Sequence, residues 1–376
     1  MKNKQAIVIG AGIVGLATAR ALSLKGFSVK VFDRNHQAAG ASIRNFGMIW
    51  PIGQPEGKLY GRAVRSRNIW KETCEAAGIW HETPGSLHLA FHADEMQVLT
   101  ELQEIFKQQG RNVSLLTKTE ITRKYNAVNP ENLLGGLYSS EEMIVDPRES
   151  IAKLPGYFTA QYAIEFYWGK CISYISGQTV YIGNEEEHEA DIIFVCGGAD
   201  FETLYPEVYA AMPLTKCKLQ MMRLATQPDN WRIGTALCGG LSLIHYNSFK
   251  VAPSLNDLKI RYQQEMGEYV KWGIHVMVSQ NGRGELTVGD SHEYGSTFDP
   301  FDKQFINTLI LDYLRQFASF KDWSVIESWN GTYSKLTNGD TDIFISPEKD
   351  VYILNGLGGA GMTMAFGLAE EMVETL

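Results

Sequence analysis

Short apolar runs alternate with helical patterns at the start of the chain. The first run, residues 7–9, leads into a glycine-rich turn, and residues 16–24 continue with the Ala- and Leu-rich pattern of a helix that Gly26 ends. A second apolar run, residues 27–32, follows at once. A strand, a helix and a second strand in this order predict a parallel sheet with helices packed on it.

Further periodic segments follow along the chain. Apolar residues at helical spacing predict helices over residues 56–77, 94–109, 119–125, 149–160 and 305–317. Short apolar or alternating runs predict strands over residues 86–91, 113–116, 163–167, 179–182 and 191–195. The alternating runs 218–225, 274–278 and 285–288 are typical of an antiparallel sheet. The chain closes with the apolar run 351–354, a second glycine-rich turn over residues 355–363 and a final helix.

The first glycine-rich turn has the spacing of a dinucleotide-binding motif. Gly10 permits the tight turn, Gly12 lets the backbone approach a pyrophosphate, and Gly15 lets the helix pack closely on the strand. Asp33 follows about 20 residues later, where an acid accepts hydrogen bonds from ribose hydroxyls. The motif predicts a dinucleotide site. The alternative is a glycine-rich turn in another kind of α/β protein.

The second glycine-rich turn changes which cofactor we expect. A nicotinamide cofactor needs one such turn, whereas a turn at each end of the chain suggests a longer molecule held at both ends, and FAD fits. The last helix would direct its N-terminal amides at the N1 edge of the flavin, where negative charge gathers on reduction. The alternative is a flexible closing loop in front of a core helix. The run 191–195 ends in Cys196, Gly197 and Gly198, as a parallel strand does where it approaches a cofactor.

Composition excludes several classes of function. The 376 residues suffice for two domains, and the net charge of −9 argues against nucleic acid as a main partner, although a small anionic substrate needs only a few local cations. The chain shows neither a transmembrane run nor the layout of a signal peptide, so we expect a cytoplasmic protein. The five cysteines are scattered without metal-ligand spacing, which predicts free thiols and no metal site.

Four blocks of the chain together resemble the D-amino-acid oxidase, glycine oxidase and sarcosine oxidase superfamily of flavoproteins. They are GAGIVG with Asp33, the loop GASIRNFG over residues 40–47, the strand that ends in VCGGAD, and the closing glycine-rich turn. A narrower resemblance points to a bacterial subgroup associated with phosphonate utilisation. It is carried by the segments ASIRNFG, CKLQMMRL, GDSHEYG and WNGTY.

The resemblance implies an α/β (overall α+β) protein with two domains. A Rossmann-like FAD-binding domain of the glutathione-reductase type would comprise residues 1–83, 145–212 and 325–376. A substrate domain on a mixed or antiparallel sheet would comprise residues 84–144 and 213–324. FAD should be non-covalent, because no cysteine lies near residues 331–333, where related sarcosine oxidases attach it. The expected FAD contacts are Gly10, Gly12, Ile13, Val14, Gly15, Asp33, Arg34, Ser42, Arg44, Asn45, Gly47, Cys171, Ile172, Cys196, Gly197, Gly198, Gly356, Gly358, Gly359, Ala360, Gly361, Met362 and Thr363.

The resemblance also implies oxidation of a small amine or N-methylamine. Hydride transfer to flavin N5 would leave an imine that water hydrolyses to a carbonyl product. Many relatives clamp a substrate carboxylate with an arginine near residues 331–335, but the sequence here is GTYSK, which counts against an ordinary α-amino acid and leaves room for an aminoalkylphosphonate. We expect the catalytic and substrate-binding residues to be Arg44, His245, His292 and Tyr333, with Lys218, Arg223, Tyr246, His275 and Tyr294 as further candidates.

Several alternatives stay open at this point. Each histidine could be an ordinary hydrogen-bonded residue, Arg44 a surface ion pair, and Asp290 and Glu293 either holders of an ammonium group or turn caps. The chain could instead oxidise a 2-hydroxy acid, use NAD, or hold flavin as a subunit without turnover. The sequence does not decide whether oxygen or another acceptor, such as a membrane quinone, reoxidises the flavin, nor does it fix the oligomeric state.

Overall fold

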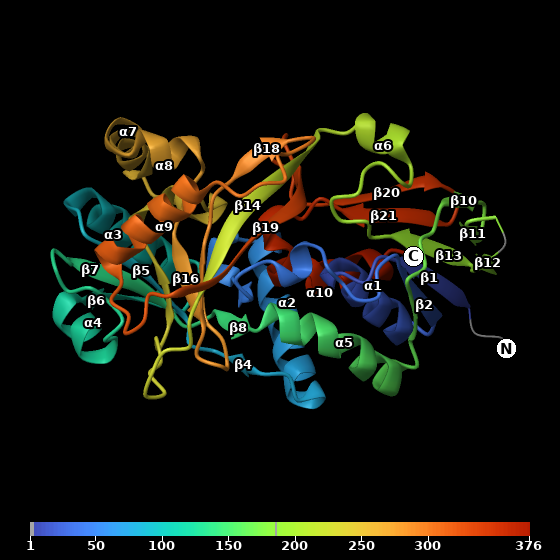
Figure 1. Ribbon diagram of the computed structural model, residues 1–376, viewed down its shortest axis with the longest axis horizontal. Coiled ribbons are helices and arrows are strands. Elements are labelled where there is room, and N and C mark those ends of the chain that lie inside the picture. The colour runs from blue at the N-terminus through green and yellow to red at the C-terminus, as the bar shows by residue number, and fades with distance from the viewer. Residues whose placement is uncertain (1–3, 185) are drawn as a thin grey trace.

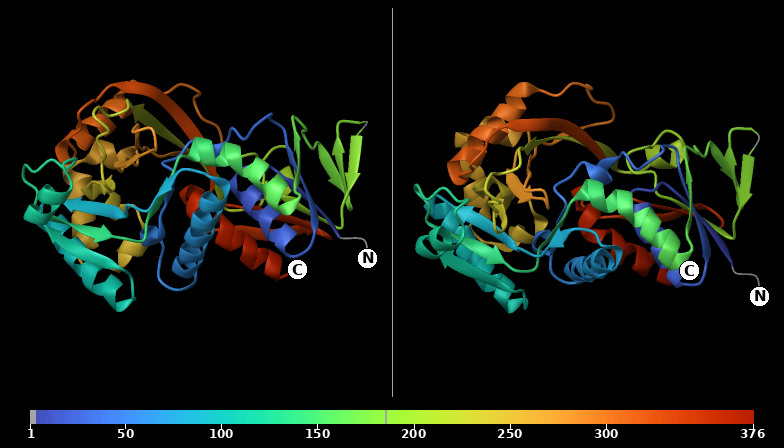
Figure 2. Two further views of the ribbon diagram at one scale, coloured as in Figure 1. Left: turned by 90° about the horizontal axis from the view of Figure 1, so that it is seen from below. Right: turned by 60° about the horizontal axis from the view of Figure 1, so that its bottom comes forward.

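The structure is a computed structural model that describes residues 4–184 and 186–376. Two large sheets lie side by side, the first on the right and the second on the left in Figure 1, and both ends of the chain lie on the side of the first sheet. Figure 2 shows the same two parts from below, with helices packed on each. This mixed α/β arrangement confirms the predicted fold class.

The first sheet places the beginning and the end of the chain next to each other. Its strand order is β20 (Ile343–Glu348), β21 (Val351–Asn355), β13 (Ile192–Val195), β1 (Gln5–Ile9), β2 (Ser28–Asp33) and β9 (Glu165–Trp168), and every pair is parallel except β20 with β21. The apolar residues of β1 are therefore enclosed by strands on both sides, as a central parallel strand requires. Parallel pairing also brings the loops that follow β1, β13 and β21 to one edge.

Two helices, over residues 13–24 and 147–162, pack on strands of this sheet, and two more pack on these helices. Helix α1 (Ile13–Leu24) contacts α10 (Gly361–Glu374) and α5 (Pro147–Tyr162), and α10 also contacts α2 (Lys58–Ala77). The N-termini of α1 and α10 thus lie at the edge where the strands end. This arrangement sets the helix that follows the first glycine-rich turn beside the helix that follows the second (Figure 1).

The second sheet is mostly antiparallel, as predicted for residues 213–300. Its order is β18 (Glu293–Gly295), β14 (Leu214–Leu224), β17 (Leu286–Gly289), β16 (Met277–Gln280), β15 (Ala236–Cys238), β5 (Ser86–Ala90), β7 (Gly135–Ser139) and β6 (Val113–Thr117), with β19 (Val325–Leu336) paired to β14. Only β15 and β5 run parallel among these described strands. The run 274–278 is shifted from its predicted place, because the strand begins at Met277 and residues 274–276 lie outside it.

The remaining elements cover the edges of these sheets. Two small sheets hold β3 (Met48–Ile49), β8 (Met143–Val145) and β4 (His81–Glu82), and β10 (Tyr174–Ser176), β11 (Thr179–Ile182) and β12 (Glu186–Glu189). The other helices are α3 (Ala93–Gln108), α4 (Lys118–Lys124), α6 (Pro206–Ala210), α7 (Leu255–Glu265), α8 (Gly267–Lys271) and α9 (Gln304–Phe317). Short 3-10 turns are η1 (Ala41–Ile43), η2 (Pro51–Gly53), η3 (Gly240–Ile244), η4 (Asn247–Val251) and η5 (Gly358–Ala360).

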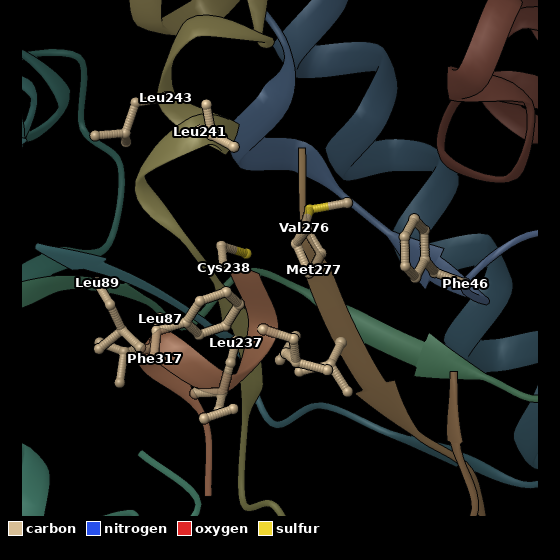
Figure 3. Close-up of a cluster of buried hydrophobic side chains, with 14 of the residues drawn as sticks. Phe46, Leu87, Leu89, Leu237, Cys238, Leu241, Leu243, Val276, Met277 and Phe317 are labelled. Carbon is tan, nitrogen blue, oxygen red and sulfur yellow. The ribbon is translucent and has the colours of Figure 1, made fainter. Parts of the chain in front are cut away.

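A large apolar cluster supports the second sheet and reaches the space between the sheets. Figure 3 shows side chains of β5, β15 and η3 packed together with Phe317 of α9. Phe46 and Met277 belong to the same cluster and also line the cavity described below. The wall of that cavity is therefore held by core packing. No helix among the described residues combines the length and apolar character needed to cross a bilayer.

Candidate active site

A cavity of about 910 Å³ lies between the two sheets. Its wall is formed by the loops after β1, β13 and β21, by residues 38–46, and by β14, β16 and β19 of the second sheet. The volume is near the upper end of the range for ligand-binding pockets. The residues expected to contact FAD line it except Gly15 and Gly47, and so do Arg44, His245, His292 and Tyr333.

Gly15 and Gly47 do not face the cavity, and each has a packing reason to be glycine. A Cβ on Gly15 would lie 1.8 Å from the backbone oxygen of Gly10, so only glycine lets α1 approach β1 this closely. Gly47 has φ of +72°, and its Cβ would lie 2.0 Å from the Val145 oxygen. The expectation that these two residues contact FAD is therefore not met by their placement; they shape the turn and the loop instead.

The first turn presents an open backbone to the cavity. Gly12 precedes α1 with an ordinary extended conformation, and no acidic side chain occupies the first turn of the helix. Ser42 Oγ accepts a hydrogen bond from the Ile13 N–H at 2.9 Å, which fastens residues 41–43 to the start of α1. A helix N-terminus of this kind favours a negatively charged ligand.

Asp33 lines the same end of the cavity and holds the turn in place. Its Oδ2 accepts the Ala11 N–H at 2.9 Å, and its Oδ1 accepts the Asn35 N–H at 2.9 Å. Each carboxylate oxygen keeps further acceptor capacity. Arg34 beside it forms an ion pair with Asp200, so the charge of Arg34 is compensated within the protein.

The loop with Arg44 is braced by Asn45. The Asn45 amide donates to the oxygens of Ala41 and Ser42 at 3.0 and 2.9 Å, and its Oδ1 accepts the Gly47 N–H at 2.8 Å. Arg44 lines the cavity, and its Nη1 donates to the backbone oxygen of Asn330 in β19 at 3.0 Å. Among the described residues no carboxylate pairs with Arg44, so a surface ion pair is not its role.

The closing turn lies opposite, at the start of α10. Residues 356 and 358–363 line the cavity, and the first turn of α10 has no acidic residue. Asn355, which the sequence analysis did not single out, fixes this turn. Its Oδ1 accepts from Ser334 Oγ at 2.6 Å and from the Gly356 N–H at 2.8 Å, and its Nδ2 donates to the Gly198 oxygen at 2.8 Å.

One end of the cavity is rich in polar side chains. They lie on β18 and β19 and in the loops next to η1, η3, β16 and β17, and are Arg44, His245, Tyr246, His275, Asp290, His292, Tyr294, Tyr333 and Lys335. Burial lowers the pKa of His275 well below the usual value and that of His292 to about 4. Burial also raises the pKa of Asp290 and of Tyr333. The imidazoles of His275 and His292 and the phenol of Tyr333 are therefore neutral at neutral pH, and the carboxyl of Asp290 holds a proton more readily than an ordinary one.

Lys335 adds a cation that sequence analysis missed. Its Nζ donates to the Tyr294 hydroxyl at 2.9 Å and lies over the Tyr294 ring, 4.8 Å from the ring centroid. The alternation of polar and apolar residues in β19 could have indicated which side chains face the cavity, but the strand itself was not predicted. Lys335 and Arg44 give this end of the cavity a positive character.

Three further residues that the sequence offered for substrate binding lie away from the cavity. Lys218 donates to the backbone oxygens of Asp299 and Phe301 at 2.7 and 2.9 Å. Arg223 pairs with Glu285 at 3.2 Å, and Glu293 pairs with Lys303 at 2.5 Å. None of the three lines the cavity, so the structure does not place them where they would contact a substrate bound there.

The sequence profile of the DAO family, described as FAD dependent oxidoreductase, matches residues 5–375. The fold is similar to glycine oxidase from Bacillus cereus (TM-score 0.77, 16% identity, 100% of this chain and 94% of that chain). It is also similar to L-α-glycerophosphate oxidase from Mycoplasma pneumoniae with FAD bound (TM-score 0.74, 18% identity, 100% and 94%). At these identities the likeness establishes the fold alone.

A curated relative is the tRNA 5-methylaminomethyl-2-thiouridine biosynthesis bifunctional protein MnmC of Nitrosospira multiformis. It is 24% identical over 263 residues, which are 62% of this chain and 38% of that protein. The chain spans less than two fifths of the length of the first curated relatives it matches.

Proposed function

The chain belongs to the DAO family of FAD-dependent oxidoreductases, and on this premise we propose that it oxidises a small amine or N-methylamine that carries an anionic group. An amino acid or an aminoalkylphosphonate is such a substrate. The observation that carries the proposal is the positive character of the polar end of the cavity, where Arg44 and Lys335 supply two cationic side chains.

The residues present fit FAD. The cavity joins the N-terminus of α1, where a diphosphate is favoured, to the N-terminus of α10, where negative charge on a flavin ring would be stabilised. Gly12 and Ser42 both line this end of the cavity, and a Cβ on Gly12 would lie 3.1 Å from Ser42 Oγ. Glycine at position 12 therefore leaves more room for a diphosphate between them. When bound, FAD supplies the acceptor for a hydride from the carbon next to the amine nitrogen.

Cysteine chemistry supports non-covalent binding. Cys196 lines the cavity, and burial raises the pKa of its thiol to about 12, so it is protonated and unreactive. β19 carries no cysteine where it faces the cavity. We therefore keep non-covalent FAD as part of the proposal.

The protein's own side chains bind and orient the substrate. Gly331 in β19 leaves room for Arg44, since a Cβ on Gly331 would lie 3.2 Å from the Arg44 Cβ. Arg44 follows η1, and it thus supplies a cation at the wall of the cavity that β19 forms. A guanidinium and an ammonium group together suit a phosphonate, which offers more charge and more acceptor oxygens than a carboxylate.

Anaerobic flavin bleaching tests the proposal. The purified protein should be yellow, and anaerobic addition of 2-aminoethylphosphonate, its N-methyl derivative or glycine should bleach the visible flavin absorption. Lactate, 2-hydroxyglutarate and glycerol 3-phosphate should leave it unchanged. Bleaching by a hydroxy compound alone would overturn the proposed substrate class and favour 2-hydroxy-acid oxidation. A flavin that no small molecule bleaches would indicate a subunit without turnover.

A further inference from the structure

Three histidines from separate segments meet at the polar end of the cavity. His245 follows η3, His275 lies just before β16, and His292 lies just before β18. One ring nitrogen of each lies within 4.8 Å of those of the other two. The ring centroids of His245 and His275 are 3.6 Å apart, and His292 is 5.0 Å from both.

Hydrogen bonding orients the ring of His292. Its Nδ1 is 3.0 Å from the backbone oxygen of Gly273, and a carbonyl only accepts, so Nδ1 carries the proton. In the neutral ring Nε2 is then left with a lone pair. A neutral His292 held this way can accept a hydrogen bond or bind a cation through Nε2, but it cannot donate to an anion from that atom.

The ring of His275 lies beside Asp290 without a hydrogen bond to it. Its Nε2 lies 3.3 Å from Oδ1 of Asp290, while its buried Nδ1 has no hydrogen-bond partner among the described residues. This approach is not a hydrogen bond, so Asp290 does not fix the proton of His275, and either ring nitrogen is available as a ligand. Oδ1 of Asp290 likewise has no hydrogen-bond partner in the described part of the chain.

We infer that His245, His275 and His292 bind one divalent transition-metal ion, for which Zn²⁺ is the matched probe. Three imidazole nitrogens with a fourth position open to a cavity are the ligand set of an accessible zinc site. The carboxyl group of Asp290 lies beside the cluster, with Oδ1 3.3 Å from Nε2 of His275.

The three ligand nitrogens would move closer together to hold an ion. Zn–N bonds of about 2.0–2.1 Å place tetrahedral ligand nitrogens roughly 3.3 Å apart. His245 is exposed to the cavity and makes no side-chain hydrogen bond to any described residue, so its ring can turn. The other charged group facing the cluster is Lys335, which opposes a cation and is held by Tyr294. The open metal position would then take an oxygen of the substrate anion, a role that rests on the proposed function, whereas metal binding itself does not.

Zinc titration of the FAD-loaded protein tests this site. The flavoprotein is treated with a chelator, freed of it by gel filtration and titrated with Zn²⁺ by calorimetry in the absence of any amine, with elemental analysis for stoichiometry. We expect one Zn²⁺ per chain. His245→Ala and His292→Gln should each weaken binding by at least about tenfold. His81→Gln, which changes a histidine outside the cavity, should bind as the unchanged protein does.

The outcomes separate this inference from the proposed activity. Flavin content of each variant reports whether it has folded, and His245→Ala alters only a side chain on the cavity surface. Zinc binding that is absent, or equally strong in His245→Ala and in the unchanged protein, would overturn the metal site even if amines bleach the flavin. Binding of one Zn²⁺ per chain that is lost in both cavity variants would support the metal site, even if no amine bleaches the flavin. If instead these variants raise the KM for the amine while Zn²⁺ does not bind, the imidazoles contact substrate and the metal site is wrong.

Discussion

The backbone N–H of Ala11 donates to Oδ2 of Asp33 at 2.9 Å, so the acid at the end of β2 holds the glycine-rich turn at the end of β1. The second oxygen of the same carboxylate accepts the Asn35 N–H. Sequence reasoning placed Asp33 at a ribose. The structure shows that Asp33 also shapes the turn, so its replacement acts on the fold as well as on the cofactor.

Replacing Asp33 separates these two roles. In Asp33→Ala both backbone N–H groups lose their acceptor, so we expect weaker FAD binding and a loss of stability of about 1–3 kcal/mol. Asp33→Asn keeps one acceptor oxygen and removes the charge, so its stability should lie closer to the unchanged protein while FAD binding is still weakened. Flavin content and urea unfolding measure the two effects. Full flavin content in Asp33→Ala would show that no cofactor hydroxyl depends on this carboxylate.

Gly12 and Gly15 should respond differently to substitution. A side chain on Gly12 enters the cavity, so Gly12→Val should fold and fail to take up FAD. A Cβ on Gly15 meets the Gly10 oxygen at 1.8 Å, so Gly15→Ala should disrupt the packing of α1 on β1 and lower the yield of folded protein. Circular dichroism and flavin absorption distinguish the two. A Gly12→Val protein that retains full flavin would contradict the position we assign to the diphosphate.

Sequence reasoning found the elements with strong local signals. The runs that became β1, β2, β13 and β21 are apolar and bounded by glycine, and the apolar stripe of α9 is plain in the chain. It missed α7, which buries only Leu258 and Tyr262 and therefore has little periodic signal. It also missed β19, whose first residues are exposed and whose pairing with β14 joins distant segments.

The candidate site, like the fold, was predicted only where the signal in the sequence is local. The cofactor turns are local motifs, and nearly all the residues predicted there line the cavity. The histidine cluster is built from three segments that the second sheet brings together, and no spacing in the sequence predicts it. Arg223 and Lys218 looked equally suitable as cations, but Arg223 pairs with an acid and Lys218 is held by backbone oxygens away from the cavity.

Arg44 should affect anionic substrates more than uncharged ones. Arg44→Ala removes the guanidinium from the cavity wall and its hydrogen bond to Asn330. A charge-assisted hydrogen bond contributes about 1.5–3 kcal/mol, so we expect the KM for an anionic amine to rise by roughly tenfold to a hundredfold. An uncharged amine of similar size is the control and should change less. Unchanged flavin content together with unchanged kinetics would show that Arg44 binds neither cofactor nor substrate.

Glu142 should make stability depend on pH. It is fully buried, and burial raises the pKa of its carboxyl to about 7, although the Ile52 N–H and the Ser86 hydroxyl donate to it. The pKa in the unfolded chain is near the ordinary value of 4.5. Between these two values the folded protein keeps a proton that the unfolded chain releases. The free energy of unfolding therefore falls as the pH rises through this window, by about 3 kcal/mol in all.

Glu142→Gln isolates this effect, because an amide of the same shape stays neutral at every pH. Urea unfolding of both proteins at about pH 5 and about pH 8 gives the difference between them, in which the contributions of all other groups cancel. The free energy of unfolding of the Gln variant minus that of the unchanged protein should therefore increase from about pH 5 to about pH 8. A difference that stays constant across the window would mean that the Glu142 carboxyl ionises alike in the folded and unfolded chain, and that its enclosure is looser than the structure shows.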